Sequence, residues 1–134
     1  MNQVRVLAAV VQRDGSYLVC KRPAHKRHGD LWEFPGGKLE TNETLFDAAN
    51  RELAEELGVR ALSVAAPILS VADPGSSFVI EFVPTTISGE PTCLEHSELR
   101  WVTLEELPSL PLAPSDRKFV DFLLARARDA TDKT

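Results

Sequence analysis

Apolar residues recur along this chain with two periods, one typical of strands and one of helices. Residues 4–12 are mostly apolar and β-branched and predict a strand. Asp14-Gly15 is a turn signal, and residues 16–21 predict the second strand of a hairpin. Residues 23–38 hold two Pro, three Gly and several charges, which predicts a long loop. A long loop in a compact domain is more often functional than idle.

Residues 44–57 give the clearest helical pattern. An apolar stripe recurs every four residues and predicts a face turned to the core: Leu45, Ala49, Leu53 and Leu57. Thr41 or Asn42 is the candidate N-cap, and Gly58 stands where a C-terminal glycine would end the helix.

The second half of the chain predicts more strands and a closing helix. Segments near 61–72 and 78–87 are apolar and β-branched, and Asp73-Pro74-Gly75 between them predicts a second hairpin. A further strand is expected at 99–103 and a short helical turn at Glu105-Glu106.

Residues 115–128 predict the closing helix. Ser115 is its candidate cap, Asp116 lies in its first turn, and Arg126 and Arg128 lie in its last. Since strands and helices are interleaved, the expected fold class is α/β or α+β, with helices packed on a mixed sheet.

Length, charge and cysteine content narrow the possible functions. The 134 residues suit a single domain, 1–134, and the net charge of −5 argues against a nucleic-acid polymer as partner. Cys20 and Cys93 form no CxxC pair, so we expect no zinc site and a reducing, cytoplasmic setting. The uncharged run at 6–11 is too short for a signal peptide or a membrane span.

The acidic residues of the 44–57 helix carry the candidate chemistry. Glu52, Glu55 and Glu56 stand at i, i+3 and i+4, so they share one helix face and repel one another. Bound divalent cations would offset that repulsion, and Mg²⁺ takes oxygen ligands. The plainer interpretation is a solvated acidic face, with Arg51 as a salt-bridge partner.

A wider pattern decides between these interpretations. Segment 37–59, GKLETNETLFDAANRELAEELGV, fixes seven residue identities at set spacings, and a chance match is on the order of 10⁻⁹ to 10⁻⁸ at ordinary residue frequencies. The segment resembles a complete Nudix box, G-x5-E-x7-R-E-U-x-E-E-x-G-U with U aliphatic, with no departure from it.

The resemblance implies an α/β/α sandwich whose loop–helix–loop box grips metal and diphosphate. By motif position, Glu52, Glu55 and Glu56 would be metal ligands and catalytic residues, joined by the backbone carbonyl of Gly36. Arg51 and Glu43 would orient the carboxylates. The implied cofactor is Mg²⁺, with Mn²⁺ as a substitute.

The flanking segments 21–23, 31–38, 95–102 and 111–116 resemble the MutT-like branch that holds bacterial CTP and 8-oxo-dGTP pyrophosphohydrolases. That resemblance implies conversion of a (d)NTP to (d)NMP and pyrophosphate. It also implies a further glutamate before the Trp strand, either Glu95 or Glu98. We favour Glu98 as the catalytic one and keep Glu95 as a candidate metal ligand.

Four residues are candidates for substrate binding. Arg22 and Lys38 would contact phosphate unless they are ordinary surface cations, and Phe34 lines either a base pocket or the core. Asp116 would read the base, although a first-turn carboxylate can simply favour the helix dipole. His96, Trp32 and Trp101 are interpreted as structural residues.

Two other functions stay open on the sequence. Nudix hydrolases of ADP-ribose, NDP-sugars or dinucleoside polyphosphates tend to carry a proline several positions after the box. Pro67 stands nine residues after Gly58, so this kind of hydrolase is an alternative. The chain could also be an inactive nucleotide-sensing module, but such modules usually carry a broken box. The expected assembly is a monomer or a homodimer with no membrane contact.

Overall fold

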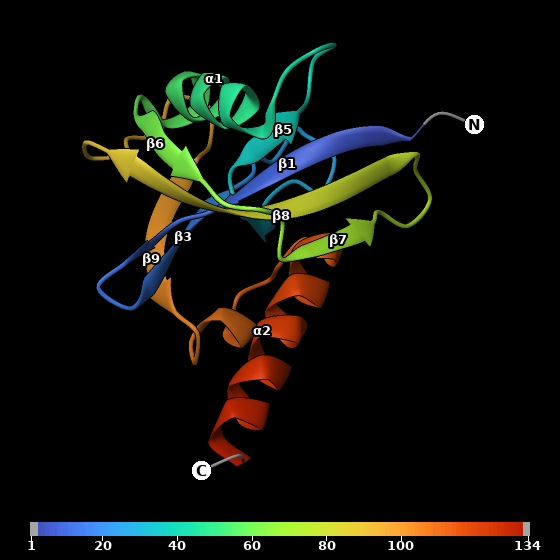
Figure 1. Ribbon diagram of the computed structural model, residues 1–134, viewed down its shortest axis with the longest axis vertical. Coiled ribbons are helices and arrows are strands. Elements are labelled where there is room, and N and C mark those ends of the chain that lie inside the picture. The colour runs from blue at the N-terminus through green and yellow to red at the C-terminus, as the bar shows by residue number, and fades with distance from the viewer. Residues whose placement is uncertain (1–2, 133–134) are drawn as a thin grey trace.

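The protein is described from a computed structural model that covers residues 3–132. Two sheets form the middle layer, with helices α1 (Leu45–Leu57) and α2 (Pro114–Asp132) on opposite sides (Figure 1). The strands are β1 (Val4–Val10), β2 (Gln12–Arg13), β3 (Ser16–Lys21), β4 (Trp32–Glu33), β5 (Gly36–Lys38), β6 (Arg60–Val64), β7 (Leu69–Ala72), β8 (Phe78–Ser88) and β9 (Glu98–Thr103). This arrangement confirms the expected α/β sandwich with a mixed sheet.

The larger sheet has the order β5-β1-β8-β6, and β7 also pairs with β8. Strands β1 and β8 run parallel, while β5 is antiparallel to β1. The smaller sheet joins β2, β3 and β4, with β9 antiparallel to β3. Strand β5 contains Gly37 and Lys38, the first two residues of the box, so the box begins at an edge of the larger sheet.

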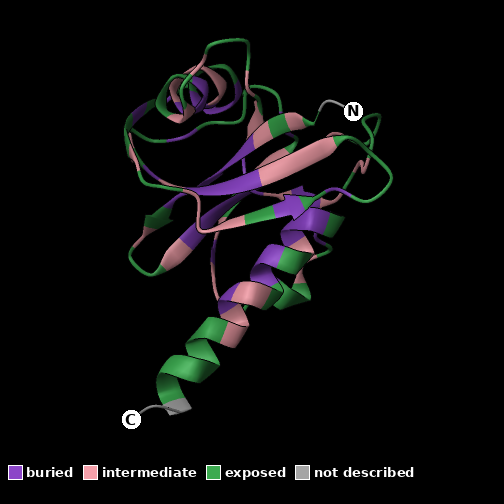
Figure 2. Ribbon diagram, turned by 45° about the vertical axis from the view of Figure 1, so that its right-hand side comes forward, coloured by how far each residue is buried: buried purple, intermediate pink, exposed green. Residues whose placement is uncertain are grey.

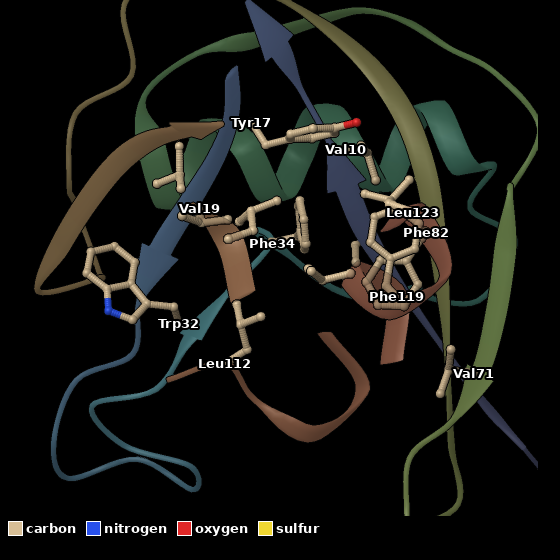
Figure 3. Packing of buried hydrophobic residues seen from close by; sticks show 14 residues of the cluster. Val10, Tyr17, Val19, Trp32, Phe34, Val71, Phe82, Leu112, Phe119 and Leu123 are labelled. Carbon is tan, nitrogen blue, oxygen red and sulfur yellow. The ribbon is translucent and has the colours of Figure 1, made fainter. Parts of the chain in front are cut away.

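Strand β1 supplies both cores because its side chains alternate between the two faces of the sheet. Leu7 and Ala9 pack on the α1 side with Leu53, while Ala8 and Val10 pack on the α2 side with Phe119. Figure 3 shows the α2-side core, in which Phe34, Phe82 and Phe119 lie in ring contact. The first turns of α2 are buried there, and its later turns project into solvent (Figure 2).

Helix α1 matches its predicted stripe, but the predicted cap is wrong. Thr44 is the N-cap: its Oγ1 accepts from the Asp47 N–H at 3.1 Å, and the Asp47 carboxylate accepts from the Thr44 N–H. Asn42 has φ 66° and belongs to the preceding turn. Gly58 ends the helix in the left-handed conformation, as predicted.

Several strand boundaries also differ from the prediction. The 4–12 run divides at Val11 into β1 and β2, and the 23–38 loop contains the short strands β4 and β5. Segment 61–72 divides into β6 and β7 because these strands pair with different halves of β8. The short helical turn is a 3₁₀ helix at Leu107–Ser109, two residues later than expected.

The closing helix is longer than predicted, and Ser115 does not cap it. Helix α2 begins at Pro114, and the Ser115 hydroxyl donates instead to Asp73 Oδ1 at 3.0 Å. Arg126 and Arg128 precede the last turn, which holds no basic residue within the described chain. Neither helix of the described chain is long and apolar enough to span a bilayer.

Candidate active site

Helix α1 presents its three glutamates at different depths. The Glu56 residue is only 8% exposed, and its Oε1 accepts from the Gly36 N–H at 3.0 Å. The Glu52 carboxylate packs against Gly37, where a Cβ atom would collide with it. Glu55 faces solvent, with half of its side chain exposed. Gly37 therefore lets the β5 backbone approach the Glu52 carboxylate closely, while the missing Cβ of Gly36 leaves room for the backbone of β1.

Arg51 joins the box loop to the helix. Its guanidinium donates to both Glu43 oxygens at 2.8 Å, to Glu52 Oε1 at 2.6 Å and to the Lys38 carbonyl at 2.9 Å. The hydrogen bonds from Arg51 lower the pKa of Glu43 to about 2, so Glu43 stays ionised at any physiological pH. Arg51 thus links Glu43 and the Lys38 carbonyl of the box loop to Glu52, which is the arrangement that an orienting role would need.

The pKa of Glu56 is raised to about 9, chiefly by burial and then by the charges of Glu33 and Glu52. Burial also raises the pKa of Glu52, against the opposing effect of Arg51. A buried carboxylate facing other carboxylates needs positive charge nearby to ionise. In the described residues, no three His, Cys, Asp or Glu side chains form a ready ligand cluster. Arg51 holds Glu52 in this arrangement.

A small cavity of about 90 Å³ opens beside Glu56. It is lined by Arg22, Pro23, Lys26, Glu33, Glu56, Glu95 and His96. The preference for Glu98 is not supported by this geometry. Glu98 pairs with its neighbour Arg100 at 2.8 Å and lines neither this cavity nor the next one. Of the two candidates, Glu95 is the one beside the carboxylates of α1.

A larger cavity of about 260 Å³ adjoins the same carboxylates. Its lining combines apolar residues of β1 and β8 with polar residues from several elements, among them Arg22, Arg27, Glu33, Lys38, Glu56, Asp73 and Asp116. Its volume lies just below the range of roughly 300–1,000 Å³ that is typical of small-molecule sites. Arg22, Glu33 and Glu56 line both cavities, so the two share a wall.

Asp116 lies in the larger cavity at the start of α2. It is 7% exposed, and its Oδ1 accepts from the Phe34 N–H at 2.9 Å. Burial, and then the charge of Glu33, raise its pKa well above the ordinary value, while the Phe34 N–H opposes the shift. This bond fixes the loop before β5 to a residue that also lines the larger cavity.

Comparison with known proteins identifies the family. The NUDIX domain model matches residues 1–123. The chain belongs to the Nudix family. It is 37% identical to the CTP pyrophosphohydrolase of Escherichia coli over 98% of this chain and the whole of that protein. It is 34% identical to the putative 8-oxo-dGTP diphosphatase 2 of Mycobacterium tuberculosis, over 90% of this chain and 86% of that one.

Solved Nudix structures share the fold. The solution structure of the E. coli ORF135 protein superposes with a TM-score of 0.80 and 36% identity, covering 96% of this chain and 94% of that one. These matches confirm a Nudix pyrophosphohydrolase of the MutT-like branch. They also remove the inactive sensing module as an interpretation.

The candidate substrate-binding residues of this Nudix protein differ in how far other groups of the protein already occupy them. Lys38 lies on the cavity with its Nζ 4.9 Å from the Phe78 ring centroid. Arg22 is already held by Glu33 at 3.0 Å and by the Arg27 carbonyl at 2.7 Å. Phe34 is 3% exposed and packs in the core, so it meets the cavity only at its edge. Pro67 lies between β6 and β7 and lines neither cavity.

Sequence reasoning missed two parts of the site. Glu33 lines both cavities, yet it stands between two aromatic residues, Trp32 and Phe34, whose hydrophobic character dominates the local sequence pattern. Asp73 was interpreted as a turn residue. It is buried, lines the larger cavity and pairs with Arg27 at 3.4 Å. Side chains alternate between the two faces of a strand, so a buried Trp32 would have predicted that Glu33 lies on the opposite, polar face. The contacts of Asp73, in contrast, depend on the tertiary fold.

Proposed function

We propose that this Nudix protein is a Mg²⁺-dependent nucleoside triphosphate pyrophosphohydrolase that converts a (d)NTP and water to (d)NMP and pyrophosphate. The preferred substrate is of the CTP/dCTP type or an oxidised dGTP. The observation that carries the proposal is the shared wall: Glu33 and Glu56 line both the small acidic cavity and the larger one that contains Asp116. A nucleoside in the larger cavity thus has its phosphates directed at the acidic residues of α1.

The donor set suits a hard divalent cation. The proposed ligands are Glu52, Glu55, Glu56 and Glu95 with the Gly36 carbonyl, all of them oxygen donors, which Mg²⁺ and Mn²⁺ accept. Burial of Glu56 disfavours its ionised form, and a bound cation would reverse that preference. A bound Mg²⁺ would polarise phosphorus and lower the pKa of the attacking water.

The protein's own residues would then bind, orient and accept a proton. Lys38 and Arg22 meet phosphate oxygens, while Arg51 keeps Glu52 and the box loop in register. A carboxylate of the α1 cluster accepts the proton of the attacking water. Asp116 reads the base. Cytosine offers an exocyclic amino donor, and guanine or 8-oxoguanine offers N1–H and an amino group, whereas uracil presents a carbonyl where cytosine has its amino group.

A nucleotide panel with Mg²⁺ tests the proposal. The panel contains CTP, dCTP, 8-oxo-dGTP, UTP and ADP-ribose, with nucleotide products separated by chromatography and pyrophosphate distinguished from phosphate. We expect NMP and pyrophosphate from a cytidine or oxidised guanosine triphosphate, and no turnover in excess EDTA. Orthophosphate as the first product, or ADP-ribose as the preferred substrate, would contradict the proposal.

A further inference from the structure

The segment between β8 and β9 carries Glu95, and its main chain is attached to the body of the protein around that residue. The Thr92 N–H donates to the Leu57 carbonyl and the Leu94 N–H to the Glu56 carbonyl, both at 2.9 Å. The Ser97 N–H donates to the Lys21 carbonyl at 3.1 Å. The first two bonds satisfy carbonyls of the last turn of α1, so they fix the segment beside the acidic helix face.

Between these attachments, the backbone of Glu95 and His96 makes no hydrogen bond to another described residue. Glu95 nevertheless lies close enough to Glu52 and Glu56 for its charge to affect both. Glu95 is exposed, and repulsion between the three carboxylates favours arrangements in which it lies farther from Glu52 and Glu56. A side-chain attachment within this stretch would oppose that movement.

The His96 side chain makes that attachment. It is 4% exposed, and its Nε2 lies 2.9 Å from Glu33 Oε2. Glu33 is itself fixed on β4, because its other oxygen accepts from Arg22 Nη1 at 3.0 Å. The imidazole thus joins the Glu95 segment to the wall that separates the two cavities.

The other ring nitrogen strengthens this interpretation. His96 Nδ1 is buried with no hydrogen-bond partner in the described chain. An unpaired buried polar atom costs stability, and an apolar side chain at this position would avoid that cost. The Glu33 bond is consequently the only polar interaction that accounts for a histidine here.

We propose that His96 is a positioning residue whose hydrogen bond to Glu33 holds Glu95 beside Glu56 in the metal site. The proposal rests on the proposed function, since it takes Glu95 as a metal ligand. Leu94 anchors one side of Glu95 to the helix, and His96 anchors the other side to β4. The bond preorganises the ligand, which otherwise has to be brought against the charges of Glu52 and Glu56 at each binding event.

The test measures Mn²⁺ affinity without substrate, by electron paramagnetic resonance of the free ion. We expect His96→Ala to weaken Mn²⁺ binding about 10- to 50-fold, within the 10- to 100-fold order known for partners of metal ligands. His96→Gln should recover most of the affinity, because its amide can still donate to Glu33. His25→Ala, at an exposed histidine of the 22–31 loop, is the matched control and should bind as the unaltered protein does.

Comparing the single variants with the double variant distinguishes a positioning role of His96 from a general loss of structure. Glu95→Gln should weaken Mn²⁺ binding by itself, and adding His96→Ala to it should change the affinity little, because the residue to be positioned is already disabled. Circular dichroism and Tm check that each variant is folded. Full multiplication of the two losses, unchanged Mn²⁺ affinity in His96→Ala, or no recovery in His96→Gln would overturn the proposal.

Failure of the proposed function gives a different result. If the protein hydrolyses triphosphates and Glu56→Gln loses Mn²⁺ while Glu95→Gln does not, the function holds and the positioning role of His96 is overturned. If the unaltered protein neither binds Mn²⁺ nor hydrolyses any nucleotide, both are overturned.

Discussion

Glu56 is the residue on which the proposed chemistry most depends. It is buried, it accepts from the Gly36 N–H, and it lines both cavities. We expect Glu56→Gln to lower kcat at least about 100-fold, a loss of the order caused by removing one preorganised catalytic group. Glutamine keeps the Gly36 hydrogen bond and removes the charge, so the fold should persist. Steady-state kinetics and far-UV circular dichroism measure the two effects, and near-normal kcat would rule out Glu56 as a metal ligand.

Asp116 allows a pH prediction for the metal-free protein. Its pKa in the fold is raised by burial and by Glu33, and lowered by the Phe34 N–H and Arg22. A raised pKa means that the fold favours the protonated acid. This contribution is complete below the unfolded pKa of about 3.9 and is lost as the pH rises toward the folded pKa.

Asp116→Asn cannot ionise and keeps an oxygen to accept from the Phe34 N–H. The free energy of unfolding of this variant, relative to the unaltered protein, should therefore be higher at pH 8 than at pH 5. Urea denaturation at both pH values measures the difference, and the comparison cancels the titration of groups that do not interact with Asp116. A difference that shrinks as the pH rises would show that Asp116 ionises easily in the fold.

The same position tests base recognition. A bidentate base contact discriminates by roughly 1–3 kcal/mol, or about 5- to 150-fold. Asp116→Asn should lower kcat/KM for the preferred triphosphate by that order and affect UTP much less, with the metal requirement unchanged. Because asparagine preserves the bond to Phe34, an equal loss on both substrates would show that Asp116 has no part in selecting the base.

The residues of the box were predictable because their spacing is local. One turn of helix places Glu52, Glu55 and Glu56 on a face whatever the rest of the chain does. The choice between Glu95 and Glu98 was not predictable in this way. It depends on backbone bonds from Thr92 and Leu94 to the end of α1, which join residues more than thirty positions apart.

At the scale of elements, helix α1 was predicted well except at its start. Its stripe and Gly58 are local signals, whereas Thr41, Asn42 and Thr44 are all reasonable caps by residue type. The Asp47 side chain decides between them, since it completes a capping box only with Thr44. The division of 61–72 into β6 and β7 could not be predicted from local sequence either, because it results from pairing of both strands with β8.

The cap can be tested directly. Thr44→Ala removes the oxygen that accepts from the Asp47 N–H, and loss of such a cap costs about 1 kcal/mol. Thr41→Ala, at an exposed turn position three residues earlier, is the matched control and should stay within about 0.5 kcal/mol of the unaltered protein. Urea denaturation of both variants gives the values. Equal destabilisation by the two changes would mean that the turn as a whole, and not Thr44, holds the helix start.

At the scale of the whole molecule, the interleaving of strands and helices predicted the layers but not the sheet order. Strand β1 pairs in parallel with β8, which lies about seventy residues later, and no local pattern encodes that pairing. It brings Lys38 of β5 and Phe78 of β8 to one cavity. The proposed nucleotide site is therefore a product of topology, while the acidic helix face is a product of local sequence.

That difference leads to a prediction for the folded molecule. The acidic residues around Glu56 repel one another in the metal-free protein, so a cation that binds only the folded state must stabilise the whole domain. At a free Mg²⁺ concentration of about 100 times Kd the gain is roughly 2.7 kcal/mol. For a domain of this size, that gain corresponds to a rise in Tm of about 10 °C.

Calorimetry with and without Mg²⁺ measures the shift, with NaCl at equal ionic strength to account for general screening. Glu56→Gln should lose most of the shift, whereas Thr44→Ala should begin at a lower Tm and keep it, because its altered residue is at the far end of α1. An equal rise in Glu56→Gln and in the unaltered protein would mean that Mg²⁺ binds elsewhere on the acidic surface.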